Sequence, residues 1–397
     1  MRDALKLVSS IEDLSRNGLT NRVEMPQEML TRLTHIVKRR THSQLKHLRE
    51  NLATDETAKD RQIPLDMYNR PLGWTLDKDE QIKPFLYGPS ETMAYLAEDV
   101  EMTYACAHQA FRQLQQSRPD FAPQSVLDFG AGPGTASWVA KDYYDASVTR
   151  YRVLEPSQSM VDAAEVMLDG FPGLSIRRSV SEMKREIQNG LSYDLIVLNF
   201  VLSEITTDYE RVAVMSALWE LLSDKGVLVI ADRGSTWGSH QVRSARQFIL
   251  DSVAQEDGEQ EERAHVVAPC PHAFECPMTG KTWCHFVQRS PRVQYPRDAT
   301  TKRWHGHKVS KFSYVVMEKS KAPTSEAAAP PGQVGRLIRG PLLANKHVML
   351  DLCMPNGELE RRAVTRGKAI REVYRASRKA HWGATWPADA SIYRDNK

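Results

Sequence analysis

The stretch VLDFGAGPG constrains the fold most, because a run of apolar residues passes directly into a loop with a glycine at every second position. The apolar run predicts a buried strand, and Thr135 begins a predicted helix after the loop. Gly130, Gly132 and Gly134 allow the backbone to approach a ligand closely, next to the free N–H groups of the helix. The next predicted strand ends in Glu155, 21 residues after Gly134, where a carboxylate can accept both hydroxyls of a ribose. Together these features predict a nucleoside-binding site.

Apolar runs alternate with helical patterns from Ser125 onward, which predicts a parallel α/β sheet covered on both faces. We expect a long helix that begins with Ser90 as its N-cap in front of this sheet. The predicted strands are SVLDFGAG, YRVLEPS, LSIRRSV, YDLIVLNF and GVLVIADRG, followed after a cysteine segment by TWCHFVQR and FSYVVMEK.

Dinucleotides and S-adenosylmethionine both suit such a site. Asp128, on the strand before the glycine loop, favours S-adenosylmethionine, because a carboxylate there can stand near the sulfonium and the amino group of the ligand. An acidic residue followed by G-x-G-x-G resembles the first motif of the class I methyltransferase family, and the last two predicted strands suit its antiparallel final pair. The predicted cofactor-binding residues are Asp128, Gly130, Gly132, Gly134, Glu155 and Asn199.

The sequence offers no recognisable catalytic group. Members of this family that methylate exocyclic amines usually carry Asn/Asp-Pro-Pro-aromatic after the fourth strand, where this chain has Asn199, Phe200, Val201 and Leu202. The pair Pro269-Cys270 follows the fifth strand and its helix, so it lies in the wrong place for the nucleophile of a pyrimidine C5 enzyme. Whether the chain is an enzyme stays open.

Three cysteines are spaced C-x5-C-x7-C at Cys270, Cys276 and Cys284, and Cys353 follows 69 positions after Cys284. A C-x-x-C knuckle is absent, so the usual zinc-ribbon pattern does not apply. Four thiolates from separate loops can still bind Zn²⁺ or an iron–sulfur cluster, and the alternative is a group of core thiols. His272 and His285 are possible substitutes.

Charge is distributed unevenly along the chain. From Ser290 onward there are 21 Lys and Arg against nine Asp and Glu, whereas the first 289 residues hold 32 basic and 41 acidic residues. A basic end suggests an anionic partner, of which nucleic acid is the commonest, while solvated surface charge is the alternative.

The last predicted helix, KAIREVYRASRKAHW, concentrates this positive charge on one face. Its cations recur at steps of three and four opposite an apolar strip, so one face can dock on protein while the other follows phosphates. Trp382 and Trp386 add flat surfaces on which bases can stack. The predicted RNA-binding residues are Arg371, Arg375, Arg378 and Lys379.

The expected organisation has four parts: a helical and irregular N-terminal region at 1–84, a class I methyltransferase-like domain at 85–319, a flexible linker at 320–335, and a basic hairpin and helix at 336–397. Five cysteines in 397 residues do not make a disulfide scaffold. No run of eighteen apolar residues occurs, so we expect no membrane partner.

Several stretches together resemble one family more specifically. YGPSETMAYLAEDVEMTYA, SVLDFGAGPGTASW, APCPHAFECPMTGKTWCHFVQR, HVMLDLCMPNGELERRAV and YRASRKAHWG, spread over about residues 85–382, resemble the methyltransferase-like proteins of the mitochondrial small ribosomal subunit. The resemblance implies a protein of the mitochondrial matrix that binds small-subunit rRNA, with ribosomal proteins or other assembly factors, while the subunit is assembled. It also implies a [4Fe–4S] cluster, with zinc as the alternative, on Cys270, Cys276, Cys284 and Cys353.

Three functions follow from these patterns. The first is an assembly factor in which the cluster clamps the basic C-terminal part onto the rest of the chain. The second is an active S-adenosylmethionine-dependent rRNA methyltransferase, supported by the glycine loop and opposed by the missing catalytic motif. The third is a small-molecule methyltransferase, which would not require the basic end.

Overall fold

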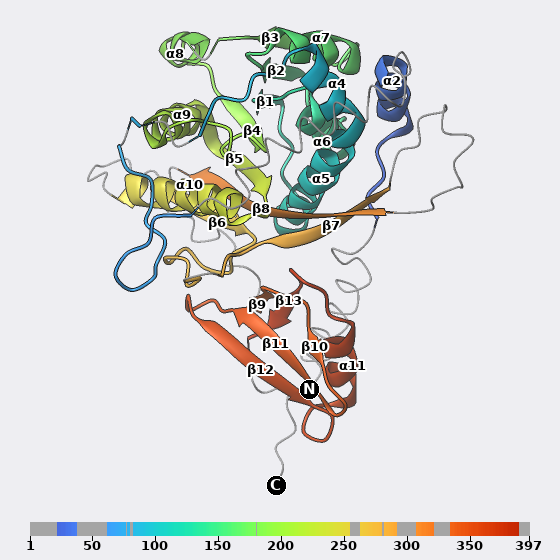
Figure 1. Cartoon of the computed structure of the whole chain (residues 1–397), viewed down its shortest axis with the longest axis vertical. Coiled ribbons are helices and arrows are strands. Elements are labelled where there is room, and N and C mark those ends of the chain that lie inside the picture. Colours follow the sequence, from blue (N-terminus) through green and yellow to red (C-terminus); the bar gives the residue numbers. More distant parts are fainter. Residues whose placement is uncertain are drawn as a thin grey trace.

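The computed structural model describes residues 22–37, 62–76, 78–79, 82–179, 181–254, 263–279, 282–291, 307–320 and 334–388. In this part of the chain two sheets lie one above the other along the longest axis (Figure 1). We call residues 89–320 the large domain and residues 334–388 the C-terminal module. Most of the expected linker, residues 321–333, lies outside the described ranges. None of the helices in those ranges is long and apolar enough to cross a membrane.

The large domain is built on an eight-stranded sheet in the order β3-β2-β1-β4-β5-β8-β6, with β7 paired to β8. Strands β1 to β5 run parallel, and β8 is antiparallel to β5, β6 and β7. The strands are β1 Ser125–Phe129, β2 Arg150–Leu154, β3 Ser175–Arg177, β4 Tyr193–Asn199, β5 Leu222–Arg233, β6 Arg263–Ala268, β7 Phe286–Pro291 and β8 His307–Ser320. The predicted parallel sheet is confirmed, whereas β6, with the sequence RAHVVA, was not among the predicted strands.

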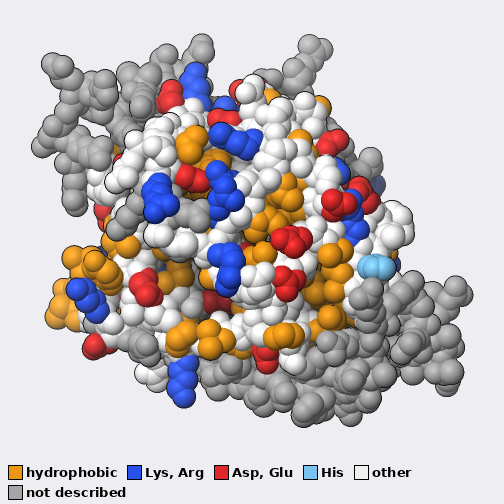
Figure 2. Space-filling view, turned by 90° about the horizontal axis from the view of Figure 1, so that it is seen from above, with side chains coloured by type: hydrophobic (Ala, Val, Ile, Leu, Met, Phe, Trp, Pro, Cys, Tyr) orange, Lys and Arg blue, Asp and Glu red, His pale blue; other side chains and the backbone are white. Residues whose placement is uncertain are grey.

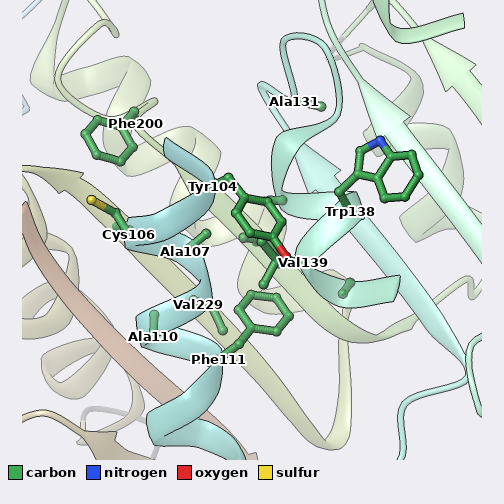
Figure 3. Packing of buried hydrophobic residues seen from close by; sticks show 14 of the residues in the cluster. Tyr104, Cys106, Ala107, Ala110, Phe111, Ala131, Trp138, Val139, Phe200 and Val229 are labelled. Atoms are coloured by element: carbon green, nitrogen blue, oxygen red, sulfur yellow. The ribbon is translucent and has the colours of Figure 1, made fainter. Parts of the chain in front are cut away.

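Helices cover both faces of this sheet, and alternate residues of each strand supply the two cores. In β4, Leu195 and Val197 pack against one set of helices, while Ile196 and Leu198 pack against the other. Figure 3 shows the first core, where Tyr104 and Phe111 point toward Val139. The helices are α2 Gln27–Val37, α4 Pro89–Glu98, α5 Val100–Ser117, α6 Thr135–Tyr144, α7 Gln158–Met167, α8 Ser181–Gln188, α9 Asp208–Leu221 and α10 Thr236–Ala254.

The long helix expected from Ser90 onward is wrong in two respects. Gly88 occupies the N-cap position, and Pro89 stands at the start of α4, where its missing N–H costs no hydrogen bond. The helix is also interrupted at Asp99, which has a φ of −107° and a ψ of −23° and separates α4 from α5. The Asp99 N–H still donates to Tyr95 O, and the Thr103 N–H donates to Asp99 O, so backbone hydrogen bonding continues from α4 into α5.

The C-terminal module is a five-stranded sheet with one helix packed on it. The predicted hairpin is confirmed: β11 and β12 pair in antiparallel register around Pro355, Asn356 and Gly357, and Gly357 has a φ of +82°. Its core includes Leu350, Leu352, Val373 and Trp386. The elements are β9 Val334–Leu337, β10 Leu342–Leu343, β11 His347–Cys353, β12 Leu359–Thr365, α11 Arg371–Lys379 and β13 Thr385–Pro387.

Candidate nucleoside, cysteine and nucleic-acid sites

The glycine loop connects β1 to α6, and its glycines serve different purposes. All three have positive φ angles. A Cβ atom added to Gly130 would lie 2.6 Å from Val201, and one added to Gly134 would lie 2.5 Å from Leu168. A Cβ atom on Gly132 would meet only the Met160 Sδ, at 3.9 Å. Packing therefore requires the outer two glycines, whereas Gly132 borders the space in which a ligand can approach the backbone.

Glu155 lies one residue beyond β2 and is tied directly to this loop. Its Oε2 accepts a hydrogen bond from Gly132 N at 2.9 Å, and its Oε1 accepts one from Ser157 N at 2.8 Å. Burial raises the pKa of the Glu155 carboxyl, and the two backbone hydrogen bonds oppose that rise. A carboxylate fixed at the end of β2 is suitably placed to accept ribose hydroxyls, because each of its oxygens can accept more than one hydrogen bond.

Asp128 and Asn199 lie near the ends of the neighbouring strands β1 and β4. Asp128 Oδ2 accepts hydrogen bonds from the backbone N and the Oγ of Ser137, which fastens the first turn of α6 to β1. Asn199 donates through Nδ2 to Thr103 O. In the described structure, the Asp128 Oδ1 and the Asn199 Oδ1 are buried without a hydrogen-bond partner. Two buried acceptors lacking donors fit a ligand with an amino group.

A second polar group meets the same edge of the sheet, and the sequence patterns did not predict it. Tyr87 Oη donates to Glu204 Oε1 at 3.0 Å, and Ser157 Oγ donates to Tyr87 O at 2.7 Å. Burial raises the pKa of Glu204 to about 7, and the nearby Arg233 guanidinium opposes that rise. Its position in the sequence could have identified Glu204 as a site residue. Glu204 follows the end of β4 by five residues, so it belongs to the loop at the carboxyl ends of the parallel strands.

The four predicted ligand cysteines come from two parts of the molecule. Cys270 and Cys276 lie in the loop after β6, Cys284 precedes β7, and Cys353 ends β11. His272 Nε2 lies 3.2 Å from Cys353 Sγ. Burial raises the pKa of the Cys284 thiol, and the other three thiols raise it further, so all four share one neighbourhood. Among the described residues, no three His, Cys, Asp or Glu side chains are grouped closely enough to enclose a metal ion.

Arginines brace the segments that carry these thiols. Arg246 of α10 donates to His272 O and Phe274 O at 2.8 and 2.9 Å. Arg243 of α10 donates to the carbonyl oxygens of Met278 and Cys276 at 2.8 and 3.1 Å.

Contacts between the two domains place Cys353 beside this braced loop. Arg336, which pairs with Cys353 between β9 and β11, donates through Nε to Pro269 O at 2.8 Å. A Cβ atom added to Gly357 in the hairpin turn would lie 3.1 Å from Phe274.

The four predicted RNA-binding residues on α11 are all exposed, whereas Val373, Ala376 and Ser377 on the opposite side are buried. The expectation for Trp386 was wrong: it is 0% exposed and belongs to the core of the C-terminal module. Trp382 is half-buried, with its ring centroid 4.6 Å from that of His285.

Three more exposed cations lie in the turns that precede β11 and α11, and the sequence patterns did not group them with α11. Arg366 N donates to Lys346 O at 2.8 Å, so the turn that leads toward α11 adjoins the start of β11. The additional cations are Lys346, Arg366 and Lys368.

The strand order, the antiparallel β8 and the glycine loop define a protein with the class I methyltransferase fold. Two solved methyltransferase structures are among those similar to this chain. BamL, the plantazolicin methyltransferase, is 13% identical, covers 59% of this chain and 92% of its own, and gives a TM-score of 0.37. The precorrin-6y C5,15-methyltransferase of Geobacter metallireducens is also 13% identical, covers 53% and 87%, and gives 0.32.

The chain belongs to the family described as mitochondrial small ribosomal subunit Rsm22, whose model matches residues 89–387. This result confirms the expected family and its mitochondrial character.

Individual relatives carry ribosome-related names. The human ribosome assembly protein METTL17, mitochondrial, is 26% identical over 310 residues, which are 76% of this chain and 63% of that protein. The Saccharomyces cerevisiae ribosome assembly protein RSM22, mitochondrial, is 21% identical, covering 76% and 67%. The Schizosaccharomyces pombe Rsm22-cox11 tandem protein 2, mitochondrial, is 25% identical, covering 90% and 50%. The chain thus spans 63% of the human and half of the fission-yeast relative.

Proposed function

We propose that the chain is an assembly factor of the mitochondrial small ribosomal subunit and binds small-subunit rRNA through its C-terminal module. Membership of the Rsm22 family and the names of the human and budding-yeast relatives support the assembly role. The observation that carries the RNA contact is α11, whose cations are exposed while Val373 and Ala376 anchor it in the core. Such a helix presents a rigid row of positive charge to phosphates.

The charge of the rest of the module also supports an RNA contact over ordinary solvated surface charge. Residues 334–388 contain eleven Lys and Arg and four Asp and Glu. Lys346, Arg366 and Lys368 continue the positive surface beyond the helix. By contrast, the face of the large domain farthest from the module mixes both signs of charge (Figure 2). Among the described residues, the C-terminal module therefore carries a clear excess of positive charge.

We also propose that Cys270, Cys276, Cys284 and Cys353 hold the [4Fe–4S] cluster, with Zn²⁺ as the alternative. The contacts of Arg336 with Pro269 and of His272 with Cys353 support this assignment, because they bring the fourth thiol to the loop of the first two. A bound cluster would join the module to the large domain, and its binding free energy would add to the stability of their contact.

The glycine loop, Glu155, Asp128 and Asn199 would hold S-adenosylmethionine, which supplies a transferable methyl group when bound. The unpartnered acceptors of Asp128 and Asn199 and the open approach to Gly132 support this fit. They are also the observations that favour the second candidate function, an active rRNA methyltransferase. Transfer of labelled methyl groups to small-subunit rRNA, abolished by Gly132→Arg, would establish that alternative.

The rRNA contact is tested by replacing Arg371, Arg375 and Arg378 with Gln. Each lost phosphate contact should reduce the slope of log K against log salt by about 0.7 to 0.9, so small-subunit rRNA should bind more weakly and with less salt dependence. The matched control removes the same charge from the large domain by replacing the exposed residues Arg177, Arg185 and Lys225 with Gln. Equal weakening in both proteins would reject α11 as the contact.

The cysteine site is tested by anaerobic purification followed by iron, sulfide and zinc analysis. We expect about four irons per chain and a brown colour. Cys353→Ser should lower the iron content, and Cys106→Ser, which changes a buried thiol of the large core, should not. A colourless protein with one zinc would reject the cluster in favour of the alternative metal.

A further inference from the structure

A continuous series of hydrogen bonds crosses the carboxyl edge of the large sheet. Gly132 N donates to Glu155, and Ser157 N donates to the other oxygen of the same carboxylate. Ser157 Oγ then donates to Tyr87 O, and the Tyr87 hydroxyl donates to Glu204. Tyr87 therefore bridges the segment after β2 and the loop after β4, on either side of β1 and its glycine loop.

Aromatic rings hold Tyr87 in this bridging position. The Phe85 ring lies 4.5 Å from that of Tyr87, and the Tyr95 ring lies 6.0 Å from it, both edge-on. Tyr95 belongs to α4, and its hydroxyl donates to Thr103 Oγ1 at 3.3 Å. Thr103 O in turn accepts the Asn199 amide. The bridge thus contacts both the glycine-loop side and the Asn199 side of the candidate nucleoside site.

The loop that carries Glu204 is held rigidly. Arg211, which is 0% exposed, donates to Leu202 O, Ile205 O and the Asp208 carboxylate. Ser203 N donates to Asp232 Oδ2 at 2.9 Å. A residue on such a loop keeps its position when a neighbouring contact opens.

Acidic groups outnumber basic ones around Glu204. Its carboxyl is influenced by Tyr87, by Glu155 after β2, and by Asp232 and Arg233 at the end of β5, and Arg233 is also near Asp99 between α4 and α5. Burial holds the pKa of Glu204 near 7, so the group has a proton-bearing and a charged form at neutral pH. A cation entering this space would favour the charged form.

We propose that the Tyr87–Glu204 hydrogen bond closes the nucleoside site and that Glu204, once released, is the residue that distinguishes a cationic adenosyl ligand from its neutral counterpart. Opening the contact frees one carboxylate oxygen beside the space bordered by Gly132 and Glu155. A sulfonium cation placed there gains an interaction that the corresponding thioether lacks. This inference rests on the nucleoside site proposed above and is independent of rRNA binding and of the cysteine site.

The test measures the affinity of the purified full chain for S-adenosylmethionine and for S-adenosylhomocysteine by calorimetry. Tyr87→Phe removes the closing hydrogen bond and keeps the ring, so both ligands should bind about fivefold more tightly, as expected for one lost hydrogen bond. Glu204→Gln should abolish the preference for the sulfonium ligand. Tyr143→Phe, whose hydroxyl contacts His108 on α5, is the matched control and should bind as the wild type does.

Each outcome decides one point. If the wild type binds S-adenosylmethionine and Tyr87→Phe binds it no more tightly, the closing contact is rejected while the nucleoside site stands. If Glu204→Gln keeps the wild-type preference between the two ligands, Glu204 is rejected as the discriminating residue. If no variant binds either ligand, the nucleoside site and this inference both fail, and rRNA binding by the same proteins shows whether the assembly function is affected.

Discussion

The candidate nucleoside site of the large domain and the candidate RNA-binding helix of the C-terminal module place their charged side chains in opposite ways. In the large domain, Arg211 and Asp232 are fully buried and Asp128 and Glu155 are nearly so, all held by hydrogen bonds at the carboxyl edge of the sheet. In the module, the cations of α11 are exposed. Buried charges must be paired and positioned, which suits a site for a small ligand, whereas exposed charges of one sign suit a long polyanion.

The substitution that should destabilise the protein most replaces the buried Arg211 of the large domain. Arg211→Met would leave the Leu202 and Ile205 carbonyls and the buried Asp208 without their donor. We expect a loss of about 3–5 kcal/mol in the free energy of unfolding, because one partner of a buried pair remains uncompensated. Urea denaturation measures this loss. Arg211→Lys should retain little of the stability, since an ammonium cannot replace the guanidinium fork. A loss below about 1 kcal/mol for Arg211→Met would contradict the view that the buried charges of the large domain depend on their partners.

The second effect concerns the packed glycine loop of the large domain. Gly134→Ala combines a φ of +83° with a Cβ atom 2.5 Å from Leu168, and should cost about 2–4 kcal/mol. Gly190→Ala is the matched control, because its φ is +67° and nothing lies within 4 Å of the new Cβ atom, so it should cost about 1 kcal/mol. Thermal unfolding measures both. Equal costs would mean that Leu168 yields to the new methyl group.

The third prediction is that the deprotonation of Glu204 makes the folded protein less stable as the pH rises. The pKa of Glu204 rises from 4.5 to about 7 in the folded protein. The folded state therefore holds a proton that the unfolded chain releases, and the associated stability is present below pH 4.5 and lost as the pH rises to 7. Between pH 5 and pH 8, the free energy of unfolding should fall by about 1–2 kcal/mol more in the wild type than in Glu204→Gln. This value is reduced because Glu204 is partly exposed. Identical pH profiles for the two proteins in urea unfolding would reject the assignment.

The last prediction, with the smallest change in stability, concerns the exposed arginines of α11. Replacing both Arg371 and Arg375 with Gln should change the free energy of unfolding by less than about 0.5 kcal/mol, because both side chains are exposed and away from the core of the module. A loss above about 1 kcal/mol would show that α11 uses these cations to hold the module together.

The alternation of apolar runs and helices was enough to predict the parallel sheet, the glycine loop and the position of Glu155. These features are local, because a buried strand and a tight turn each need particular residues at fixed spacing. The same argument predicted the hairpin around Gly357 and the amphipathic α11. It failed at Trp386, because a tryptophan near a basic helix can be either a stacking surface or a core residue, and periodicity does not distinguish the two. In the structure β13 pairs with β9, and Trp386 belongs to the core that the sheet and α11 form together.

Spacing along single elements was enough to predict the fold class, the glycine loop with Glu155, and the row of cations on α11. Three contacts could not be predicted in this way and are seen in the folded chain: Tyr87 with Glu204, Arg336 with Pro269, and Lys346 with Arg366. These partners lie on separate elements, and their meeting depends on how helices and strands pack against one another. Periodicity carries no information about such contacts, because many chain segments could occupy the same edge of a sheet.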